Sequence, residues 1–228
     1  MVALSLVAVV YVGLVAVVQT DMKKLIAYSS ISHMGFVTLG CFAFYAMPGE
    51  VSMRSASLVL EGAIIVMISH AFVSSAMFAG VGFIYDRLHT RKISDLGGLV
   101  NTMPLFASFF VLFSMANAGL PGTSGFVGEF MVILGSVKAG FWIAFWAATT
   151  LIIGASYTLW MVKRVIWGPV ANHHVETLQD LSGFELSSYV LLAGAVIAMG
   201  VYPKPVLDYV HHTVSYTLAQ ADKSKLQG

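Results

Sequence analysis

Residues 118–125 read Ala-Gly-Leu-Pro-Gly-Thr-Ser-Gly and interrupt an apolar stretch that runs from Met103 to Val137. As one straight helix this stretch would be about 50 Å long, well beyond the roughly 30 Å of a bilayer's hydrocarbon core. Proline removes a backbone donor, and glycine loosens the chain around it. We therefore predict a discontinuous helix over 103–136, with one half at 103–117, an unwound link, and a second half that starts near Phe126.

The residues expected to make this break are Gly119, Pro121, Gly122 and Gly125. Unwound backbone is tolerated at membrane depth only where protein buries it or water fills a cavity beside it. Broken helices mark ion or substrate sites in transporters. A proline kink without a transport role is the alternative, because prolines are tolerated in membrane helices.

Apolar stretches continue on both sides of the break. Of the 228 residues, 58% are hydrophobic and 10% are charged, against about 25% charged in a soluble domain. This composition excludes an ordinary soluble globule and a disordered chain. Stretches long enough to span a membrane lie at 2–18, 25–46, 56–84, 103–136, 140–162 and 184–202. We predict an all-α polytopic membrane protein whose bundle of about six transmembrane helices covers residues 1–202. Residues 203–228 are expected to form an interfacial helix with a polar, frayed end.

Charge is distributed unevenly between the loops. The loops after the first, third and fifth stretches carry seven basic residues, whereas the short loops on the other face carry three. The seven are Lys23, Lys24, Arg87, Arg91, Lys92, Lys163 and Arg164. Because basic loops stay in the cytoplasm, both termini are predicted to lie outside it. The net charge of +1 does not indicate a nucleic-acid partner.

Glu129 is an acidic residue inside an otherwise apolar segment, within one turn of the expected break. A carboxylate at this depth is costly unless it is paired, protonated or wet, so it is a candidate functional residue by default. Burial disfavours its charged form, which suits a group that binds and releases protons. A carboxyl group that only accepts hydrogen bonds from the freed amides of the break is the alternative, and the two are compatible.

Two histidines are expected deep in the bundle, His33 in the second stretch and His70 near the centre of the third. Histidine changes protonation near neutral pH, and serines lie beside both, so the pair could conduct protons. Lys24, about 13 Å from His33 along the same helix, is a further candidate at the headgroups. Neutral histidines that bond across helices, or axial ligation of a haem, are the alternatives. The single cysteine, Cys41, excludes a cysteine-based metal site, and no nucleotide-binding motif is present.

Several runs of residues carry a resemblance to a known family. Residues 19–36 read Gln-Thr-Asp-Met-Lys-Lys-Leu-Ile-Ala-Tyr-Ser-Ser-Ile-Ser-His-Met-Gly-Phe. The runs at 87–91, 97–98 and 119–130 and the closing Gly200-Val-Tyr-Pro203 follow in the same order. Together they resemble the antiporter-like subunits of respiratory complex I over nearly the whole chain, and most closely the subunit M branch of that family.

The resemblance implies a fold and a function. In this family inverted repeats each contain a broken helix, so the six stretches would be the second repeat plus a final helix. Glu129 would be the terminal proton-bearing residue, and His33 and His70 would lie on the hydrated polar axis that feeds it. The family usually has glycine after the second histidine, where this sequence has Ala71. The chain would hold no cofactor, since NADH, FMN, iron–sulfur clusters and quinone would be bound by other subunits.

The resemblance also implies the partners and the location of the chain. Its partners would be the lipid bilayer and the neighbouring membrane subunits of complex I, in a bacterial inner membrane. The chain is about half the family's size, so we expect a C-terminal portion that lacks the first repeat. Mrp-type cation/proton antiporters and membrane-bound hydrogenases contain similar subunits. Glu129 argues against the Mrp class, which usually has lysine at this place, and a scaffold that conducts nothing is the remaining alternative.

Overall fold

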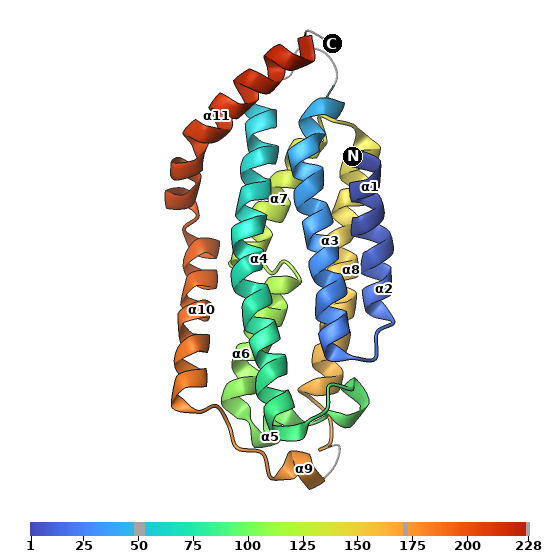
Figure 1. The fold of residues 1–228 in the computed structure, drawn as a ribbon, viewed down its shortest axis with the longest axis vertical. Coiled ribbons are helices and arrows are strands. Elements are labelled where there is room, and N and C mark those ends of the chain that lie inside the picture. Colours follow the sequence, from blue (N-terminus) through green and yellow to red (C-terminus); the bar gives the residue numbers. More distant parts are fainter. Residues whose placement is uncertain (48–52, 171–172, 227–228) are drawn as a thin grey trace.

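The computed structural model describes residues 1–47, 53–170 and 173–226. Over these ranges the chain consists of helices and loops, apart from one isolated bridge between Asp21 and Lys92. The long helices lie side by side in one elongated bundle (Figure 1). The prediction of an all-α membrane fold is therefore confirmed.

The main helices cover the six predicted stretches and the segment that follows them. In chain order they are α1 (Val2–Val7), a π-helical turn (Ala8–Val12), α2 (Gly13–Val17), α3 (Met22–Phe42), α4 (Met53–Leu88), α6 (Pro104–Asn117), α7 (Ser124–Ser136), α8 (Phe141–Val165), α10 (Gly183–Val201) and α11 (Lys204–Leu226). Short helical turns are η2 (Ala43–Ala46), η3 (Ile93–Asp95), α5 (Leu99–Thr102) and α9 (His173–Glu176).

Four of these helices are long and apolar enough to cross a membrane, namely Met22–Ala46, Met53–Leu88, Phe141–Val165 and Gly183–Val201. The other two predicted spans are assembled from shorter apolar helices. The first contains the π-helical turn at Ala8–Val12, where Ser32 of α3 donates a hydrogen bond to the carbonyl oxygen of Val9 at 2.9 Å. A π turn widens the helix by one residue, which the sequence pattern did not predict.

Glycines bring α4 and α7 into close contact at the centre of the bundle. A Cβ atom on Gly128 of α7 would lie 2.7 Å from the side chain of Val66, and one on Gly135 would overlap the side chain of Val59. Gly62 of α4 meets α7 in the same way. Small residues let membrane helices approach closely, and the dispersion attraction at this short distance holds the two helices together.

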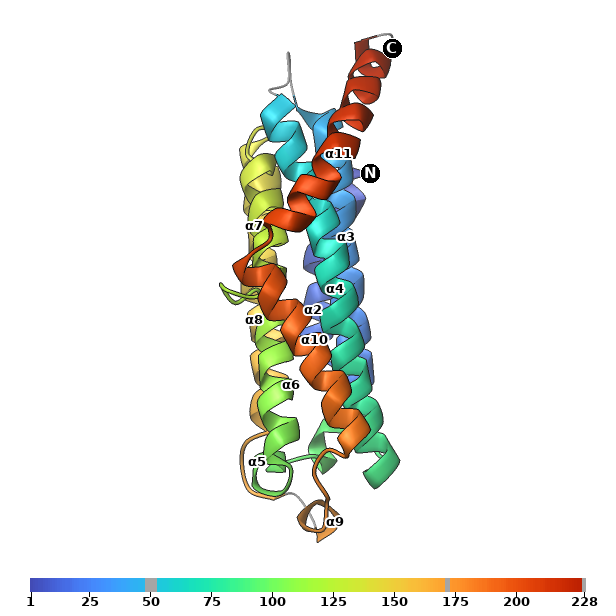
Figure 2. The same ribbon diagram turned by 90° about the vertical axis from the view of Figure 1, so that its left-hand side faces the viewer.

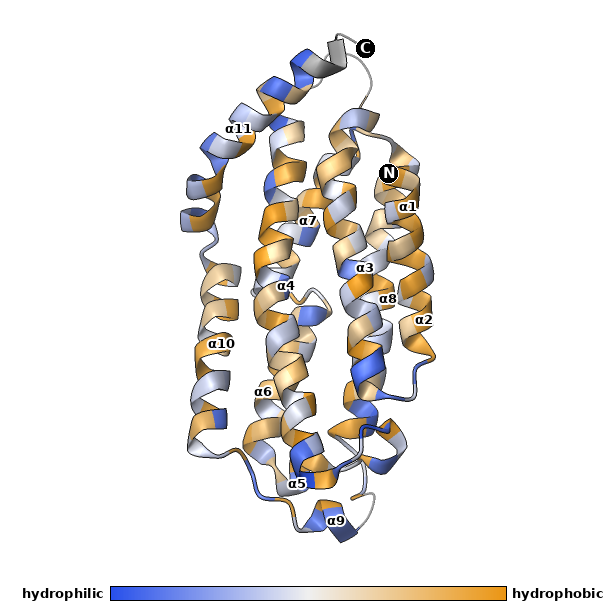
Figure 3. Ribbon diagram, in the orientation of Figure 1, coloured by the Kyte–Doolittle hydropathy of each residue, from blue (hydrophilic) through white to orange (hydrophobic). Residues whose placement is uncertain are grey.

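The seven basic loop residues gather at one end of the bundle. The ends of α2, α4 and α8 and the turns α5 and α9 all lie there, at the lower end in Figure 1. Figure 3 shows hydrophilic segments among hydrophobic ones at this end, and the middle of the bundle as mainly hydrophobic. At this end Arg87 joins α4 to α10, because its Nη1 and Nη2 atoms donate hydrogen bonds to the Glu185 carboxylate at 2.9 and 2.7 Å.

The segment after α10 forms helix α11 up to Leu226, and residues 227–228 of the predicted tail lie outside the described residues. Pro203 stands in the turn between α10 and α11. Figure 2 shows both helices lying over one side of the bundle. Val214 and Leu218 of α11 are buried against Phe44 and Ala56.

Candidate functional site

The predicted break is present as an unwound link between α6 and α7. Helix α6 ends at Asn117 and α7 begins at Ser124, two residues earlier than expected. Gly119 and Gly122 have φ angles of 78° and 90°, which favour glycine, and Pro121 stands between them.

Gly125 has a different role from the one expected for it, because it lies in the first turn of α7 and not in the link. A Cβ atom there would lie 2.5 Å from the carbonyl oxygen of Ala116 in α6. The missing side chain lets the two half-helices approach each other. Gly200 of α10 packs on the link from outside, since a Cβ atom there would overlap the backbone of Gly122 and Thr123.

Glu129 lies one turn into α7 with 3% of its surface exposed. Its Oε1 atom is 3.2 Å from Nδ1 of His33 on α3. Its Oε2 atom lies beside the link, because a Cβ atom on Gly119 would be 2.8 Å from it. The carboxyl group therefore connects His33 to the break itself.

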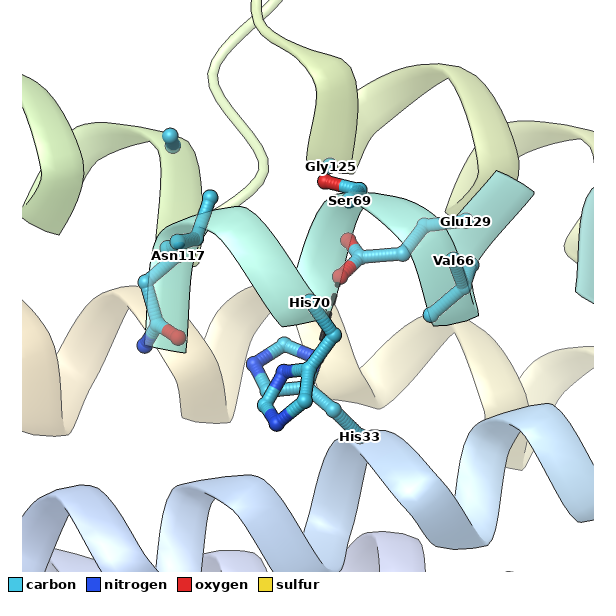
Figure 4. A pocket seen from close by; sticks show the side chains of 9 residues that line it. His33, Val66, Ser69, His70, Asn117, Gly125 and Glu129 are labelled. Carbon is cyan, nitrogen blue, oxygen red and sulfur yellow. Dashed lines mark ion pairs between the residues drawn. The ribbon is translucent and has the colours of Figure 1, made fainter. Parts of the chain in front are cut away.

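His33 and His70 are neighbours, with ring centroids 5.4 Å apart and ring planes inclined at 39°. Figure 4 shows the two imidazoles side by side, His33 from α3 and His70 from α4, with the Glu129 carboxyl group directed at His33. These three residues line a small cavity of about 10 Å³, together with Asn117 and Ser69. A space of this size holds about one water molecule.

Polar residues that the sequence analysis did not single out complete the cluster. The hydroxyl group of Tyr157, on α8, lies 3.5 Å from Nε2 of His33. Asn117 donates to the hydroxyl oxygen of Thr158 at 3.2 Å. An aromatic residue in an apolar helix is usually a packing residue. The available signals were the polar run Ser156-Tyr157-Thr158 and the position of Asn117 directly before the break.

A pair of serines ties the break to α4. The Ser69 and Ser124 hydroxyl oxygens are 2.7 Å apart, and both side chains are buried. Ser124 is the first residue of α7, so the bond fixes the start of the second half-helix against the helix that carries His70.

Lys24 lies apart from the cluster. It is exposed in the first turn of α3, where its backbone N–H donates to the Asp21 side chain at 3.0 Å. The structure thus brings Glu129, His33 and His70 together and leaves Lys24 at the basic end.

The arrangement suits proton transfer better than iron ligation. When Glu129 is ionised and His33 is neutral, Nδ1 of His33 can donate to the carboxylate and Nε2 can accept from the Tyr157 hydroxyl group. When His33 is protonated, both ring nitrogens donate. Both nitrogens of His33 thus face protein partners, which leaves neither for a haem iron. Among the described residues, no group of three or more His, Cys, Asp or Glu side chains could hold a metal ion.

The family described as "NADH:quinone oxidoreductase/Mrp antiporter, TM" matches residues 1–154. This chain belongs to that family. The antiporter-like chain is 45% identical to NADH-quinone oxidoreductase subunit M of Rhodobacter capsulatus, covering 96% of the chain and 42% of the relative. It is 41% identical to NADH-ubiquinone oxidoreductase chain 4 of Marchantia polymorpha, covering 93% and 41%. The antiporter-like chain thus spans 42% and 41% of the lengths of these curated relatives.

Solved structures show the same fold for this antiporter-like chain. A chain of respiratory complex I from Thermus thermophilus superposes with a TM-score of 0.84 at 28% identity, covering 96% of this chain and 44% of that one. A chain of the Mrp complex from Dietzia superposes with a TM-score of 0.80 at 19% identity, covering 99% and 48%. The second likeness concerns the fold alone.

Proposed function

We propose that this antiporter-like chain is the proton-translocating C-terminal part of a membrane subunit of NADH:quinone oxidoreductase. The observation that carries the proposal is the 3.2 Å contact between Glu129 Oε1 and His33 Nδ1, buried beside the helix break. A proton that leaves the carboxyl group for Nδ1 produces a carboxylate and an imidazolium in contact. That ion pair is stabilised by mutual attraction, so the transfer does not leave an isolated charge in the bundle.

The relay would continue from His33 to His70 through the adjoining cavity. The two ring centroids are 5.4 Å apart, and the cavity that both rings line has room for about one water. A water with polar partners on several sides can accept a proton from one imidazole and donate another to the next. Lys24 would be the outermost group of the relay, at the basic end.

The setting of the chain is part of the proposal. The positive-inside rule would place the basic end in the cytoplasm of a bacterial cell, with both described ends of the chain on the periplasmic side of the inner membrane. NADH, FMN, iron–sulfur clusters and quinone would be bound by other subunits. The chain would thus take part in an enzyme reaction without a redox site of its own.

Neighbouring protein would cover the break. Leu120, Pro121 and Gly122 lie in the unwound link, and Leu120 and Pro121 are exposed there. Irregular backbone is not tolerated against lipid, but it is tolerated where protein buries it. The exposure of the link therefore favours a protein partner at this face, which would be a membrane subunit of the complex or the remainder of a longer subunit.

A cation/proton antiporter of the Mrp class is the second candidate, because its fold is shared. The relatives at 45% and 41% identity are named as oxidoreductase subunits, which favours the first candidate. A subunit of a membrane-bound hydrogenase is a third candidate on the ground of resemblance alone.

The test is Glu129→Gln in the full-length subunit, in inverted membrane vesicles. NADH–quinone turnover and proton uptake are recorded together, and native gels check assembly. We expect an assembled complex whose turnover and proton uptake fall by about tenfold or more. Glu176→Gln in α9, an exposed carboxylate beside His173, is the matched control and should behave as wild type.

Two outcomes would contradict the proposal. Wild-type turnover and uptake in the Glu129→Gln variant would mean that the carboxyl group only satisfies the break. Sodium-dependent transport in vesicles without NADH would favour the Mrp class instead.

A further inference from the structure

A groove distinct from the proton cluster opens at the basic end of the bundle. Its volume is about 290 Å³, close to the lower end of the roughly 300–1,000 Å³ of ligand sites. It lies between the start of α3, the end of α4 and the loop that follows α4. The lining residues are Lys23, Phe78, Val81, Gly82, Tyr85 and Arg91.

The two cations form one side of this groove. Lys23 is exposed in the first turn of α3, and Arg91 is exposed in the loop after α4. The Arg91 guanidinium group is positioned by the Tyr85 ring, with its Cζ atom 5.4 Å from the ring centroid. Its contact with the Asp21 carboxylate runs from Nε at 3.8 Å, which is too long for a hydrogen bond.

The other side of the groove is apolar and lies on α4. Phe78, Val81 and Gly82 form this wall, because residues three and four positions apart lie on the same face of a helix. A Cβ atom on Gly82 would meet no other atom within 4 Å, so the glycine leaves a notch and is not needed for helix packing. An apolar notch below a cationic rim fits a molecule that has an anionic head and a hydrocarbon tail.

We propose that this groove binds an anionic phospholipid, with the phosphate between Lys23 and Arg91 and the first part of an acyl chain along Gly82. Basic pockets between membrane helices bind phospholipid head groups, and arginine suits phosphate because its planar fork donates two parallel hydrogen bonds. A free phosphate ion would use the cations but not the apolar wall, which is why the lipid is the favoured occupant. The site is independent of Glu129 and of the proposed proton relay.

The test uses the full-length subunit, purified in detergent and depleted of lipid. Native mass spectrometry measures the retention of added phosphatidylglycerol and, separately, of phosphatidylcholine. We expect one phosphatidylglycerol per chain, retained in clear preference to phosphatidylcholine. Lys23→Ala with Arg91→Ala should weaken this binding by about tenfold or more. Lys163→Ala with Arg164→Ala removes the same charge from the same end and should leave it unchanged.

A second pair of variants separates the lipid tail from the head group. Gly82→Leu fills the notch and should lower phosphatidylglycerol retention, whereas Gly194→Leu, at another open helix position, should not. Equal retention of the two lipids, or no effect of the Lys23/Arg91 double variant, would overturn the proposal. Displacement of the lipid by millimolar inorganic phosphate would reduce the groove to an anion site. If Gly82→Leu fails to assemble with the other subunits while Gly194→Leu assembles, a neighbouring protein occupies the groove, which would also overturn the proposal.

Discussion

The hydroxyl group of Tyr157 lies 3.5 Å from Nε2 of His33, on the side of the imidazole opposite its contact with Glu129. The histidine is therefore held from both ring nitrogens by groups on α8 and α7. Because a hydroxyl group can either donate to Nε2 or accept from it, Tyr157 is compatible with both neutral tautomers of His33, and in the proposed relay it would orient the imidazole toward Glu129. Within that proposed relay Tyr157 would be a positioning residue that acts through the histidine.

Replacement of Tyr157 by phenylalanine tests this role. The hydrogen bond contributes about 0.5–1.5 kcal/mol, so we expect proton uptake to fall by up to about tenfold and its pH profile to change shape. Uptake in inverted vesicles across a pH series is the measurement. Tyr189→Phe is the matched control, since that buried hydroxyl group has no hydrogen-bond partner among the described residues. An unchanged pH profile in Tyr157→Phe would assign the tyrosine to packing alone.

Gly200 supports the break from α10, so Gly200→Ala should disturb it. The added methyl group would overlap the backbone at Gly122 and Thr123. Overpacking of this kind costs about 1–3 kcal/mol. We expect a lower thermal unfolding midpoint and reduced proton uptake. Gly194→Ala on the same helix meets no neighbouring atom and should leave both unchanged or raise the midpoint slightly. Identical behaviour of the two variants would show that Gly200 does not support the break.

Arg87 and Glu185 join α4 to α10 through two hydrogen bonds of 2.9 and 2.7 Å. Both side chains are largely shielded, so Arg87→Ala should lower the free energy of unfolding by about 1–3 kcal/mol. Arg87→Lys keeps the charge but loses the paired geometry, and we expect it to recover only part of the loss. A double-mutant cycle with Glu185→Gln measures the coupling. Strictly additive effects would show that the pair contributes little.

Leu218 helps to hold α11 against the bundle. Its side chain is buried, whereas Tyr216 on the same helix points outward. Leu218→Ala removes apolar contact at this interface and should make α11 open more often. Limited proteolysis should then cut α11 faster than in the wild type, while Tyr216→Ala should be cut at the wild-type rate. Equal cleavage of both variants would show that α11 is held by other contacts.

The class of fold was predictable because membrane chains have strict composition rules. Spans need long apolar runs, so Glu129, His33 and His70 are conspicuous within them as candidates, and the structure shows that the three lie together. The π-helical turn at Ala8–Val12 and the role of Tyr157 were not predictable. Both depend on which helices become neighbours, and local sequence does not encode that.

The sequence alone determined that the chain is a helical membrane bundle with one broken helix, because proline and clustered glycines cannot continue a helix inside an apolar run. Tertiary structure decided that the buried acid meets His33 rather than only the freed amides of the break. It also decided that Gly125 serves the approach of two half-helices and that Gly200 packs on the link. The physical reason is that helix formation depends on neighbours in sequence, whereas side-chain partners depend on how small residues let distant helices pack.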